Sequence, residues 1–410
     1  MCWPVWATRS LTWRAPMTAL PLARSVIQTA ALVACLAGTL CVGPGCDQDV
    51  GPATIRIGVA APLTGSSGVL GEQIRMGAGL AMIQRNGQGG IDGRRIELVL
   101  GDDGADPDQA AVVANRLAGD DTILAVIGHY NSACSLAGKP VYRDAGVLQF
   151  SPGSTNVDVC RGSDWTFRNL YSDDFVARTV AQYILGSLGL SRVGVMYDDD
   201  AYGAGLKTAF VDEAGRVGLN VVGVEAYSRQ AALDFSGAVD ALHALGPEII
   251  FIPGLYNEAA LIAKETRSRG LATPFIGGDG VLSEALFDVG GEAVEGMMIM
   301  TPFIVHPEVG GVEVEEFAQR FFEAYGRPAD TWAALAYDAA NQVLDAIDQV
   351  GADRIRIRDR FAQTTSPETA FRGITGATYF DENGDCLKPA FVAVVRDGQF
   401  VPAEWQISTP

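Results

Sequence analysis

Short apolar runs alternate with segments of helical periodicity along most of the chain. The apolar run at 54–63 is followed by 71–85, where apolar residues recur on one helical face. The clearest helix is 106–119, where Asp106 can cap the helix and Pro107 fits its first turn. Strands separated by helices form βαβ units, which require parallel sheets covered on both faces. The alternation therefore predicts an α/β fold.

The alternation falls into two series. The first occupies 54–151 and the second occupies 173–280, so we expect two doubly wound parallel-sheet lobes. The remaining part contains helical segments near 312–325 and 332–349. Strand-like runs follow at 376–400, where the residues "DENGD" between them predict a turn.

The first 45 residues have the layout of a secretory signal. They contain the arginines Arg9, Arg14 and Arg24, no acidic residue, and an apolar stretch that ends in small residues before Cys46. We predict a signal peptide at 1–45 and a polar linker at 46–53. A retained membrane helix is the alternative, but the small residues and the polar sequence after them favour cleavage. Met1 and Met17 are both possible starts.

The cysteine that ends this segment suggests a bacterial lipoprotein signal. Cys46 follows Gly-Pro-Gly and precedes the polar linker, so we predict that it carries the lipid. Cys35 follows Leu-Val-Ala, a closer match to the usual motif, but its use would leave an apolar stub on the mature chain. Ordinary cleavage without a lipid is the third possibility. We expect a periplasmic protein anchored to a membrane; the sequence leaves open which membrane.

The charge of the chain restricts its partners. There are 30 basic and 49 acidic residues, and the net charge is −19. Nucleic acid and anionic membrane surfaces need clustered Lys and Arg, so neither is expected as a partner. The histidines His129, His243 and His306 lack metal-ligand spacing, and 277–280 lacks the ending of a phosphate-binding loop. We expect no metal and no cofactor.

The loop "VIGHYNSACS" (126–135) raises the possibility of an enzyme. Cys134 and His129 lie five residues apart, and a thiol beside an imidazole can act as a nucleophile. However, the base of such a pair needs a third group to orient it, and Cys134 falls in the first turn of an expected helix. We therefore interpret the loop as the rim of a pocket, in a protein that is not an enzyme. Disulfide pairing among Cys134, Cys160 and Cys386 stays open.

Ligands of open α/β sheets bind beyond the carboxyl ends of the strands. In the first series, the loops 128–135 and 151–156 are rich in Ser, Thr and Gly and precede helices, where free N–H groups attract a carboxylate. In the second series, the loops after strands supply Tyr202, Tyr256 and Asp279. An acid that faces an anion-binding loop fits a zwitterion.

Several stretches in this order resemble one family, the periplasmic solute-binding proteins for branched-chain amino acids. The stretches are "IRIGVAAPLTG", "GGIDGRRIELVLGDDGADPDQA", "VIGHYNSACS", "QFSPGSTN" and "YGAGL", and the resemblance covers about 53–400. It implies the type I periplasmic binding protein fold, with three hinge crossings between two lobes that close on a ligand. It also implies delivery of the ligand to an ABC permease. We expect a monomer.

The resemblance also suggests where the lobes divide. Lobe 1 is expected to comprise 54–170 and 302–373, and lobe 2 to comprise 171–301 and 374–405.

The resemblance assigns roles to residues of lobe 1. Ser132 matches the serine that binds the ligand carboxylate. Gly153, Ser154 and Thr155 match a loop whose backbone groups and threonine bind both α-groups of the ligand. Trp332 falls near an aromatic residue of the side-chain pocket. Each hydroxyl can alternatively cap a helix, and Trp332 can alternatively be a core residue.

In lobe 2, Tyr202 and Tyr256 match tyrosines of the cleft. Asp279 matches the acid that binds the α-ammonium group, which is usually a glutamate in this family. Leu70 stands where an aromatic residue is common, and "DDGADP" lacks a cysteine that forms a disulfide in some members.

The function predicted from these residues is the capture of an amino acid, most simply Leu, Ile or Val, for an ABC importer. The alternative is a sensor or regulator of the same fold that binds amides, urea or small carboxylic acids. A hydrolase that uses Cys134 is the third hypothesis.

Overall fold

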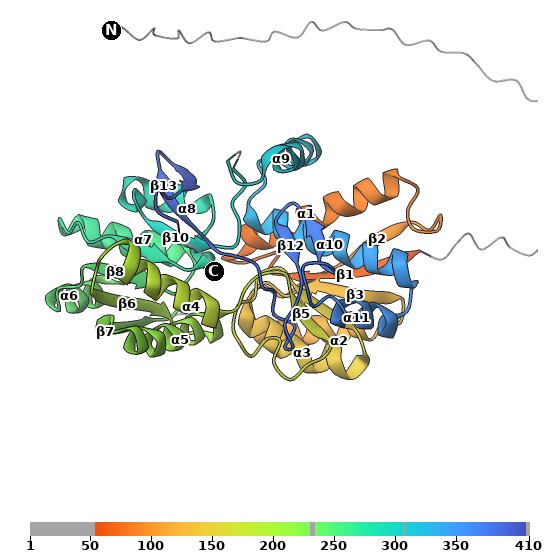
Figure 1. The fold of residues 1–410 in the computed structure, drawn as a ribbon, viewed down its shortest axis with the longest axis horizontal. Coiled ribbons are helices and arrows are strands. Elements are labelled where there is room, and N and C mark those ends of the chain that lie inside the picture. Colours follow the sequence, from red (N-terminus) through yellow and green to blue (C-terminus); the bar gives the residue numbers. More distant parts are fainter. Residues whose placement is uncertain (1–53, 230–233, 307, 407–410) are drawn as a thin grey trace, which may run out of the picture. The chain divides into compact units, whose positions relative to one another are not determined.

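The structure is a computed structural model that describes residues 54–229, 234–306 and 308–406 (Figure 1). The predicted signal peptide, the whole linker and the lipidation site Cys46 lie outside the described residues, so these predictions stay predictions.

The sheet of lobe 1 has five parallel strands in the order β2-β1-β3-β4-β5. Its strands are β1 (Ile55–Ala61), β2 (Ile96–Asp102), β3 (Ile123–Gly128), β4 (Leu148–Ser151) and β5 (Thr166–Arg168). All residues of β3 are buried, as expected for a strand covered on both faces.

Helices cover both faces of this sheet. They are α1 (Gly68–Gly87), α2 (Pro107–Ala118), α3 (Ser132–Ala145), α10 (Thr331–Val350) and α11 (Arg354–Ala362). Val59 and Ala61 pack with α1 and α10, whereas the intervening Ala60 packs with α2 and α3. This alternation follows from the two-residue period of a strand. Asp106 caps α2 as predicted, because its side chain accepts from the N–H groups of Asp108 and Gln109.

The sheet of lobe 2 has the order β14-β13-β10-β9-β8-β6-β7. The parallel strands are β6 (Arg192–Asp198), β7 (Asn220–Tyr227), β8 (Ile249–Ile252), β9 (Phe275–Gly277) and β10 (Met298–Thr301). Two antiparallel strands, β13 (Phe391–Arg396) and β14 (Gln399–Pro402), extend it beside β10.

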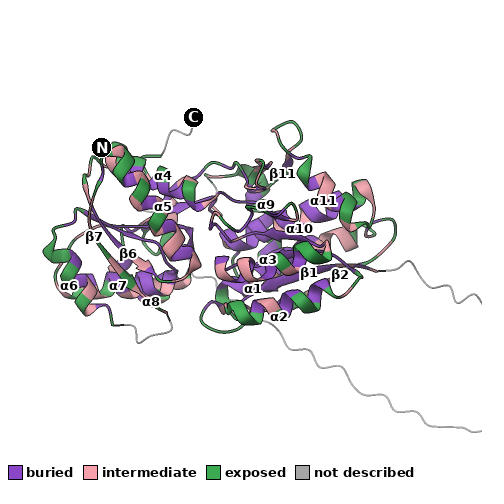
Figure 2. Ribbon diagram, turned by 90° about the horizontal axis from the view of Figure 1, so that it is seen from below, coloured by how far each residue is buried: buried purple, intermediate pink, exposed green. Residues whose placement is uncertain are grey.

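Helices also cover both faces of the second sheet. One face packs with α4 (Asp173–Gln182) and α5 (Ala201–Val217), and the other packs with α6 (Ser236–Ala244), α7 (Tyr256–Ser268) and α8 (Ala285–Gly290). Figure 2 shows buried strands in both sheets and exposed residues along the outer sides of α2 and α6. The prediction of two doubly wound parallel-sheet lobes is confirmed.

The strand order places the ligand-binding edge. In each sheet the second strand in sequence lies outside the first, and the third lies on the other side of the first. The order therefore reverses between β1 and β3 and between β6 and β8. The carboxyl ends of strands at such a reversal are where open α/β sheets bind ligands.

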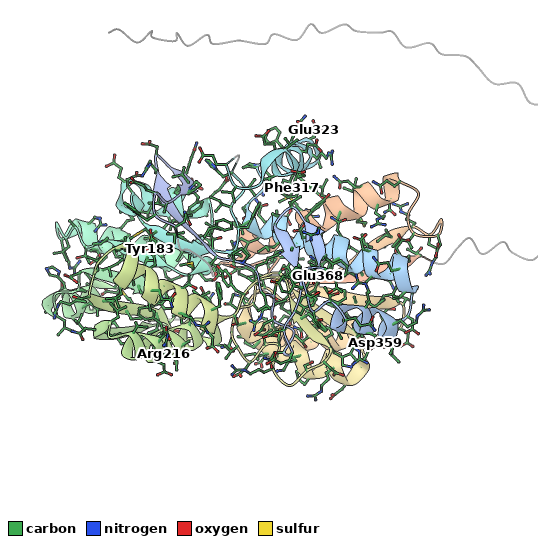
Figure 3. All side chains as sticks on the ribbon, viewed as in Figure 1. Tyr183, Arg216, Phe317, Glu323, Asp359 and Glu368 are labelled. Atoms are coloured by element: carbon green, nitrogen blue, oxygen red, sulfur yellow. The ribbon has the colours of Figure 1, made fainter. Side chains whose placement is uncertain are left out.

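Three connections join the lobes. The first leads from β5 to α4, the second from β10 to α9 (Gly311–Tyr325), and the third from the segment around Cys386 to β13. Figure 3 shows Phe317 and Glu323 on α9; Phe317 is buried and Glu323 is exposed, as expected for an amphipathic helix.

The third connection differs from the expected boundary at 373/374. Phe380 packs against Phe150 and Phe167 of the lobe 1 sheet. The segment 374–386, which we assigned to lobe 2, therefore packs with lobe 1. The lobe boundaries stay predictions, and this packing argues for moving the third one beyond Cys386.

Short elements near the ends of the lobes were not predicted from the sequence. These are β5, α8, α11 and β11 (Phe371–Gly373), which pairs with β12 (Gly376–Thr378) of the predicted run at 376–400. They are too short, or too polar, for a clear period. The turn at 381–385 is confirmed: Phe380 and Cys386 form an antiparallel bridge, and Asp381 accepts from the N–H groups of Asn383 and Asp385.

A buried ion pair joins the first and third connections. The side chain of Arg168 is fully buried, and its guanidinium group contacts Asp385, with Nε 2.7 Å from Oδ1. Its Nη1 also donates to the carbonyl oxygens of Ser154 and Asn156, at 3.0 and 2.9 Å. Removing one partner of such a pair leaves an uncompensated buried charge.

We expect Asp385→Ala to lower the free energy of unfolding by about 3 kcal/mol, because Arg168 would lose its counter-ion in the interior. Urea denaturation of the mature chain measures this. Glu316→Ala is the control, because it removes an exposed ion pair with Arg320, and its loss should stay under about 0.5 kcal/mol. Equal losses for the two variants would contradict the prediction.

Candidate functional site

A small cavity lies between the carboxyl ends of the two sheets. It is lined by Tyr130, Asn131, Ser132, Gly153, Tyr202, Leu255, Asp279, Gly280 and Trp332. The first four residues follow β3 and β4 of lobe 1, and Trp332 lies on α10. Tyr202, Leu255, Asp279 and Gly280 follow β6, β8 and β9 of lobe 2. The cavity is therefore at the edge that the strand order predicts.

The lobe 1 side of the cavity is the N-terminus of α3. Ser132 is the first residue of this helix, and the preceding Asn131 makes no side-chain cap. The N–H groups of the first helical turn lack partners within the helix and favour an anion. The Oγ atom of Ser132 accepts from the N–H of Asn156 at 3.3 Å, which links this turn to the neighbouring loop.

Gly153 brings the second loop of lobe 1 against the first. A Cβ atom at this position would lie 2.3 Å from the ring of Tyr130, closer than atoms pack. A glycine is therefore required for the two loops to meet at the cavity.

The lobe 2 side carries a buried acid. Asp279 is 2% exposed, and its Oδ1 accepts from the hydroxyl of Tyr202 at 2.9 Å. Its Oδ2 has no hydrogen-bond partner in the described part of the chain. Burial raises the pKa of Asp279 to about 7, against the opposing effect of the Tyr202 hydrogen bond. A cationic group in the cavity would restore the charged form.

Aromatic and aliphatic side chains form the rest of the wall. The rings of Tyr130 and Trp332 meet edge to face, with centroids 4.9 Å apart. Leu255 adds an aliphatic side chain from the opposite lobe. Beside two polar ends, the cavity therefore offers an apolar surface.

The lobes are closed over this cavity. Its open volume is about 10 Å³, which is room for about one water molecule. Side chains donate hydrogen bonds to backbone carbonyl groups of the opposite lobe: Asn156 to Ala201 (2.6 Å), Tyr256 to Ser66 (3.1 Å) and Trp332 to Leu282 (2.9 Å). A ligand larger than water can reach the cavity only when the lobes separate.

The structure brings five of the predicted site residues to the cavity: Ser132, Gly153, Tyr202, Asp279 and Trp332. Ser154, Thr155 and Tyr256 are not among the lining residues. Tyr256 instead makes one of the bonds between the lobes. Thr155 is fully buried two residues after the lining residue Gly153, beside Asp173. The roles assigned to all eight residues stay predictions.

The hydroxyl of Ser154 is used within lobe 1. It donates toward the carbonyl oxygens of Tyr130, at 2.9 Å, and His129, at 3.2 Å. Ser135 and Ser151 also donate to the His129 carbonyl. These bonds fix the loop that carries Ser132, so Ser154 supports the site and does not face the cavity.

The contacts of His129 and Cys134 argue against a catalytic pair. The imidazole of His129 is buried between Asp103, 2.7 Å from Nδ1, and the hydroxyl of Tyr142, 3.1 Å from Nε2. Burial raises the pKa of the Cys134 thiol far above its usual value, which removes the thiolate that a nucleophile needs. The cysteines Cys134, Cys160 and Cys386 are free and buried.

Sequence reasoning missed Tyr130, Asn131, Leu255 and Gly280 as lining residues. Each is a neighbour in sequence of a predicted residue or lies within a loop that we singled out. An apolar residue after a strand, such as Leu255, carries no signal that separates a cavity wall from the core.

A larger pocket lies away from this edge, among α1, α9, α10 and the β11–β12 hairpin, with a volume of about 700 Å³. It is open to solvent and carries both signs of charge. Arg85 in its wall already pairs with Asp345. The cleft between the lobes is therefore the better candidate for a specific site.

Comparison with known proteins agrees with this geometry. Residues 54–399 match the periplasmic binding protein family. Leu/Ile/Val-binding protein homolog 2 of Brucella abortus is 32% identical over 350 residues, which cover 85% of this chain and 92% of that protein.

Solved structures give the same result. A leucine-binding protein of Thermotoga maritima is 31% identical, with a TM-score of 0.78 over 85% of this chain and 98% of that one. A branched-chain amino acid transporter substrate-binding protein of Streptococcus pneumoniae, in complex with isoleucine, is 28% identical, with a TM-score of 0.79 over 86% and 98%.

The chain belongs to the periplasmic binding protein family, and its two lobes have the type I fold of that family. This is a family of solute-binding proteins. Within the described residues, no helix combines the length and apolar character needed to cross a membrane.

The buried acid has a consequence for stability. Because burial raises the pKa of Asp279 to about 7, the folded state binds more protons than the unfolded chain between about pH 4 and 7. The contribution of protonated Asp279 to the free energy of unfolding is therefore fully present below about pH 4 and is lost as the pH rises to about 7.

From pH 4.5 to 7.5 the wild type should lose stability as Asp279 ionises, whereas asparagine does not ionise. We therefore expect the free energy of unfolding of Asp279→Asn, relative to that of the wild type, to rise by about 3 kcal/mol over this range. Urea denaturation of both proteins without ligand at each pH measures this difference in unfolding free energy. Acids other than Asp279 titrate in both proteins, so their effects cancel in the difference. The gap should stay constant above pH 7.5. A gap that does not change with pH would show that Asp279 ionises normally.

Proposed function

We propose that this protein captures a branched-chain amino acid, Leu, Ile or Val, between its lobes in the periplasm and delivers it to an ABC import permease. The observation that carries the proposal is Asp279, a buried residue that lines the cavity opposite the N-terminus of α3 and whose Oδ2 has no hydrogen-bond partner among the described residues. The acid can pair with the ammonium group of a zwitterion, and the helix N-terminus on the opposite wall can bind its carboxylate.

The carboxylate of the ligand is placed at lobe 1. The first-turn N–H groups of α3 and the hydroxyl of Ser132 supply donors, and the loop of Gly153 and Thr155 lies beside them. Each such charge-assisted hydrogen bond is worth about 1.5–3 kcal/mol. The ligand thereby becomes attached to one lobe before closure.

The ammonium group is placed at Asp279 of lobe 2. Tyr202 fixes one oxygen of the carboxyl, which leaves the other for the ligand. An aspartate reaches one methylene less far than a glutamate, so the lobes must approach closely, as they do in this structure. Closure is thus coupled to the pairing of a charge that is otherwise buried alone.

The side chain of the ligand is placed against Tyr130, Leu255 and Trp332. This surface is apolar and small, which favours a compact aliphatic side chain. The names of the similar proteins, which specify Leu/Ile/Val or leucine binding, support the same choice.

Export and anchoring complete the proposal. We propose that residues 1–45 direct secretion and that Cys46 carries a lipid, which would hold the protein beside a membrane-bound permease. The layout of the N-terminal sequence supports this part.

A sensor for amides or small carboxylic acids is the second candidate. Asn131 supports it, since its Oδ1 atom is buried at the cavity without a partner and could accept from an amide N–H. Such a ligand would not need Asp279.

A thermal-shift panel on residues 47–410 tests the proposal, with the twenty amino acids, urea, short amides and small carboxylic acids. Leu, Ile or Val at 100 times its dissociation constant should add about 2.7 kcal/mol of stability. A response only to compounds without an α-ammonium group would reject the amino-acid assignment and favour the sensor.

In the same assay we expect Asp279→Ala to abolish binding, because the buried ammonium would cost about 3–5 kcal/mol without its partner. Ser132→Ala and Thr155→Ala should weaken binding less, since backbone N–H groups remain. Glu292→Ala, an exposed acid of the same lobe, is the matched control. Full affinity in Asp279→Ala would remove this residue from the site.

The affinity should also depend on pH. Burial sets the pKa of Asp279 at about 7 without ligand, and an ammonium group binds only its charged form. Below pH 7 the protein must therefore release a proton on binding, and the dissociation constant should rise about tenfold per unit down to pH 5. Calorimetry in buffers of different ionisation enthalpy measures the released proton. A pH-independent affinity would contradict the ion pair.

A further inference from the structure

An arginine and two acids pack behind the helical turn that carries Tyr202. Arg229 follows β7, and its side chain is largely buried. Its Nη2 atom donates to Oδ2 of Asp200, and its Nε atom forms an ion pair with Asp198. Asp198 is the last residue of β6, and Asp200 immediately precedes α5. The guanidinium group therefore bridges the end of a strand and the start of the helix that follows it.

Asp200 is also the N-cap of α5. Its Oδ1 atom accepts from the N–H of Gly203 at 2.8 Å, while its Oδ2 atom accepts from Arg229. Such a cap restrains the first turn of a helix, and Tyr202 is the second residue of this turn. A Cβ atom at Gly203 would lie 2.2 Å from the carbonyl oxygen of Asp198, so the turn lies directly against the end of β6. The direction of the Tyr202 side chain thus depends on where Asp200 holds the turn.

Tyr202 connects this turn to the proposed ammonium site. Its hydroxyl donates to Oδ1 of Asp279 at 2.9 Å and accepts from the N–H of Gly280 at 3.3 Å. The Oδ2 atom of Asp279 is left without a hydrogen-bond partner in the part of the chain that the structure describes. A shift of the first turn of α5 by about 1 Å would take the Tyr202 hydroxyl out of hydrogen-bonding range of the carboxyl group.

The charge of Arg229 is set against several acids. Burial by itself would lower the pKa of Arg229, but the charges of Asp200, Asp198 and Glu258 raise it. Burial raises the pKa of Asp198 to about 7, and the charge of Asp200 acts in the same direction, whereas Arg229 opposes both. The planar guanidinium group can bind two carboxylates at once. Arg229 therefore keeps together two acids that would otherwise repel each other.

We propose that Arg229 is a positioning residue for the ligand site: through Asp200 it fixes the first turn of α5, so that Tyr202 holds one oxygen of Asp279 and leaves the other for the ligand ammonium group. This inference rests on the proposed function and adds a further part to the same site. The described residues that line the cavity include neither Arg229 nor Asp200, so both act through Tyr202 and do not touch the ligand.

Calorimetry with leucine at pH 7.5 tests the first link. Asp200→Ala removes the cap and one partner of Arg229, while Asp198 remains as a counter-ion, so no buried charge is left alone. This variant should bind leucine roughly tenfold more weakly, as expected for the loss of one hydrogen bond to a charged group. Asp200→Asn retains an acceptor for the cap and should stay within about threefold of the wild type.

Arg216→Gln is the matched control for these variants. Arg216 lies at the other end of α5 (Figure 3) and forms an exposed ion pair with Glu213. Its removal should leave the leucine affinity unchanged. An equal loss of affinity in Arg216→Gln and Asp200→Ala would show that any lost ion pair of α5 weakens binding, and would overturn the inference.

A double-mutant cycle tests whether Arg229 acts through Tyr202. Arg229→Gln should weaken leucine binding roughly tenfold in the wild type but less than about threefold in Tyr202→Phe, because the hydroxyl on which it acts is then absent. An equal loss in both backgrounds would show that Arg229 acts elsewhere, for example on the Ala201 carbonyl that accepts from Asn156, and would overturn the inference.

The pKa of Asp279 gives a readout that needs no ligand. The hydrogen bond from Tyr202 lowers this pKa against the effect of burial, so Asp200→Ala should raise it further. Arg168 and Asp173, which also act electrostatically with Asp279, are the same in both proteins. Urea denaturation with and without Asp279→Asn gives the pH at which the difference in unfolding free energy stops rising. This pH should be higher in Asp200→Ala than in the wild type, and equal values would contradict the inference.

The outcomes separate the two proposals. A wild type that binds no amino acid refutes the proposed function, and the pKa of Asp279 then still tests the link from Asp200 to Tyr202. A wild type that binds leucine, together with full affinity in Asp200→Ala or Arg229→Gln, refutes this inference and leaves the proposed function standing.

Discussion

The fully buried guanidinium group of Arg168 connects the parts of the molecule on which the site depends. A buried cation must be paired and hydrogen-bonded, and Arg168 meets this need with Asp385 and two carbonyl groups of the loop at 154–156. The same contacts fix that loop beside the cavity and join the first connection between the lobes to the third. The position of the loop at 154–156 is therefore set by the connections between the lobes.

The two parallel sheets explain why the site is assembled from separate loops. Each sheet has the same strand order around its first strand, and each directs its carboxyl ends to the cavity. One lobe offers a helix N-terminus and the other offers Asp279, so the two polar ends of the cavity come from different lobes. The Oδ2 atom of Asp279 has no hydrogen-bond partner in the described part of the chain.

Periodicity predicted most of the fold, because buried strands and amphipathic helices repeat at distinct intervals. It did not predict β5 or the packing of 374–386 on lobe 1, since both depend on contacts between distant segments. The family resemblance led to Asp279 and Ser132, which face the cavity. The resemblance could not show that the Ser154 hydroxyl points away from the cavity. A serine whose hydroxyl donates to a backbone carbonyl and a serine whose hydroxyl faces a ligand look the same in a sequence.

Three hydrogen bonds between the closed lobes have a backbone carbonyl as acceptor, at Ser66, Ala201 and Leu282. Every residue has a backbone carbonyl, whatever its side chain. Substitutions at Ser66, Ala201 and Leu282 therefore leave these acceptors in place. If this closed form dominates without ligand, only the open fraction can admit a molecule, and the apparent affinity falls by that fraction. The donors Asn156, Tyr256 and Trp332 would then set the rate of capture as much as its strength.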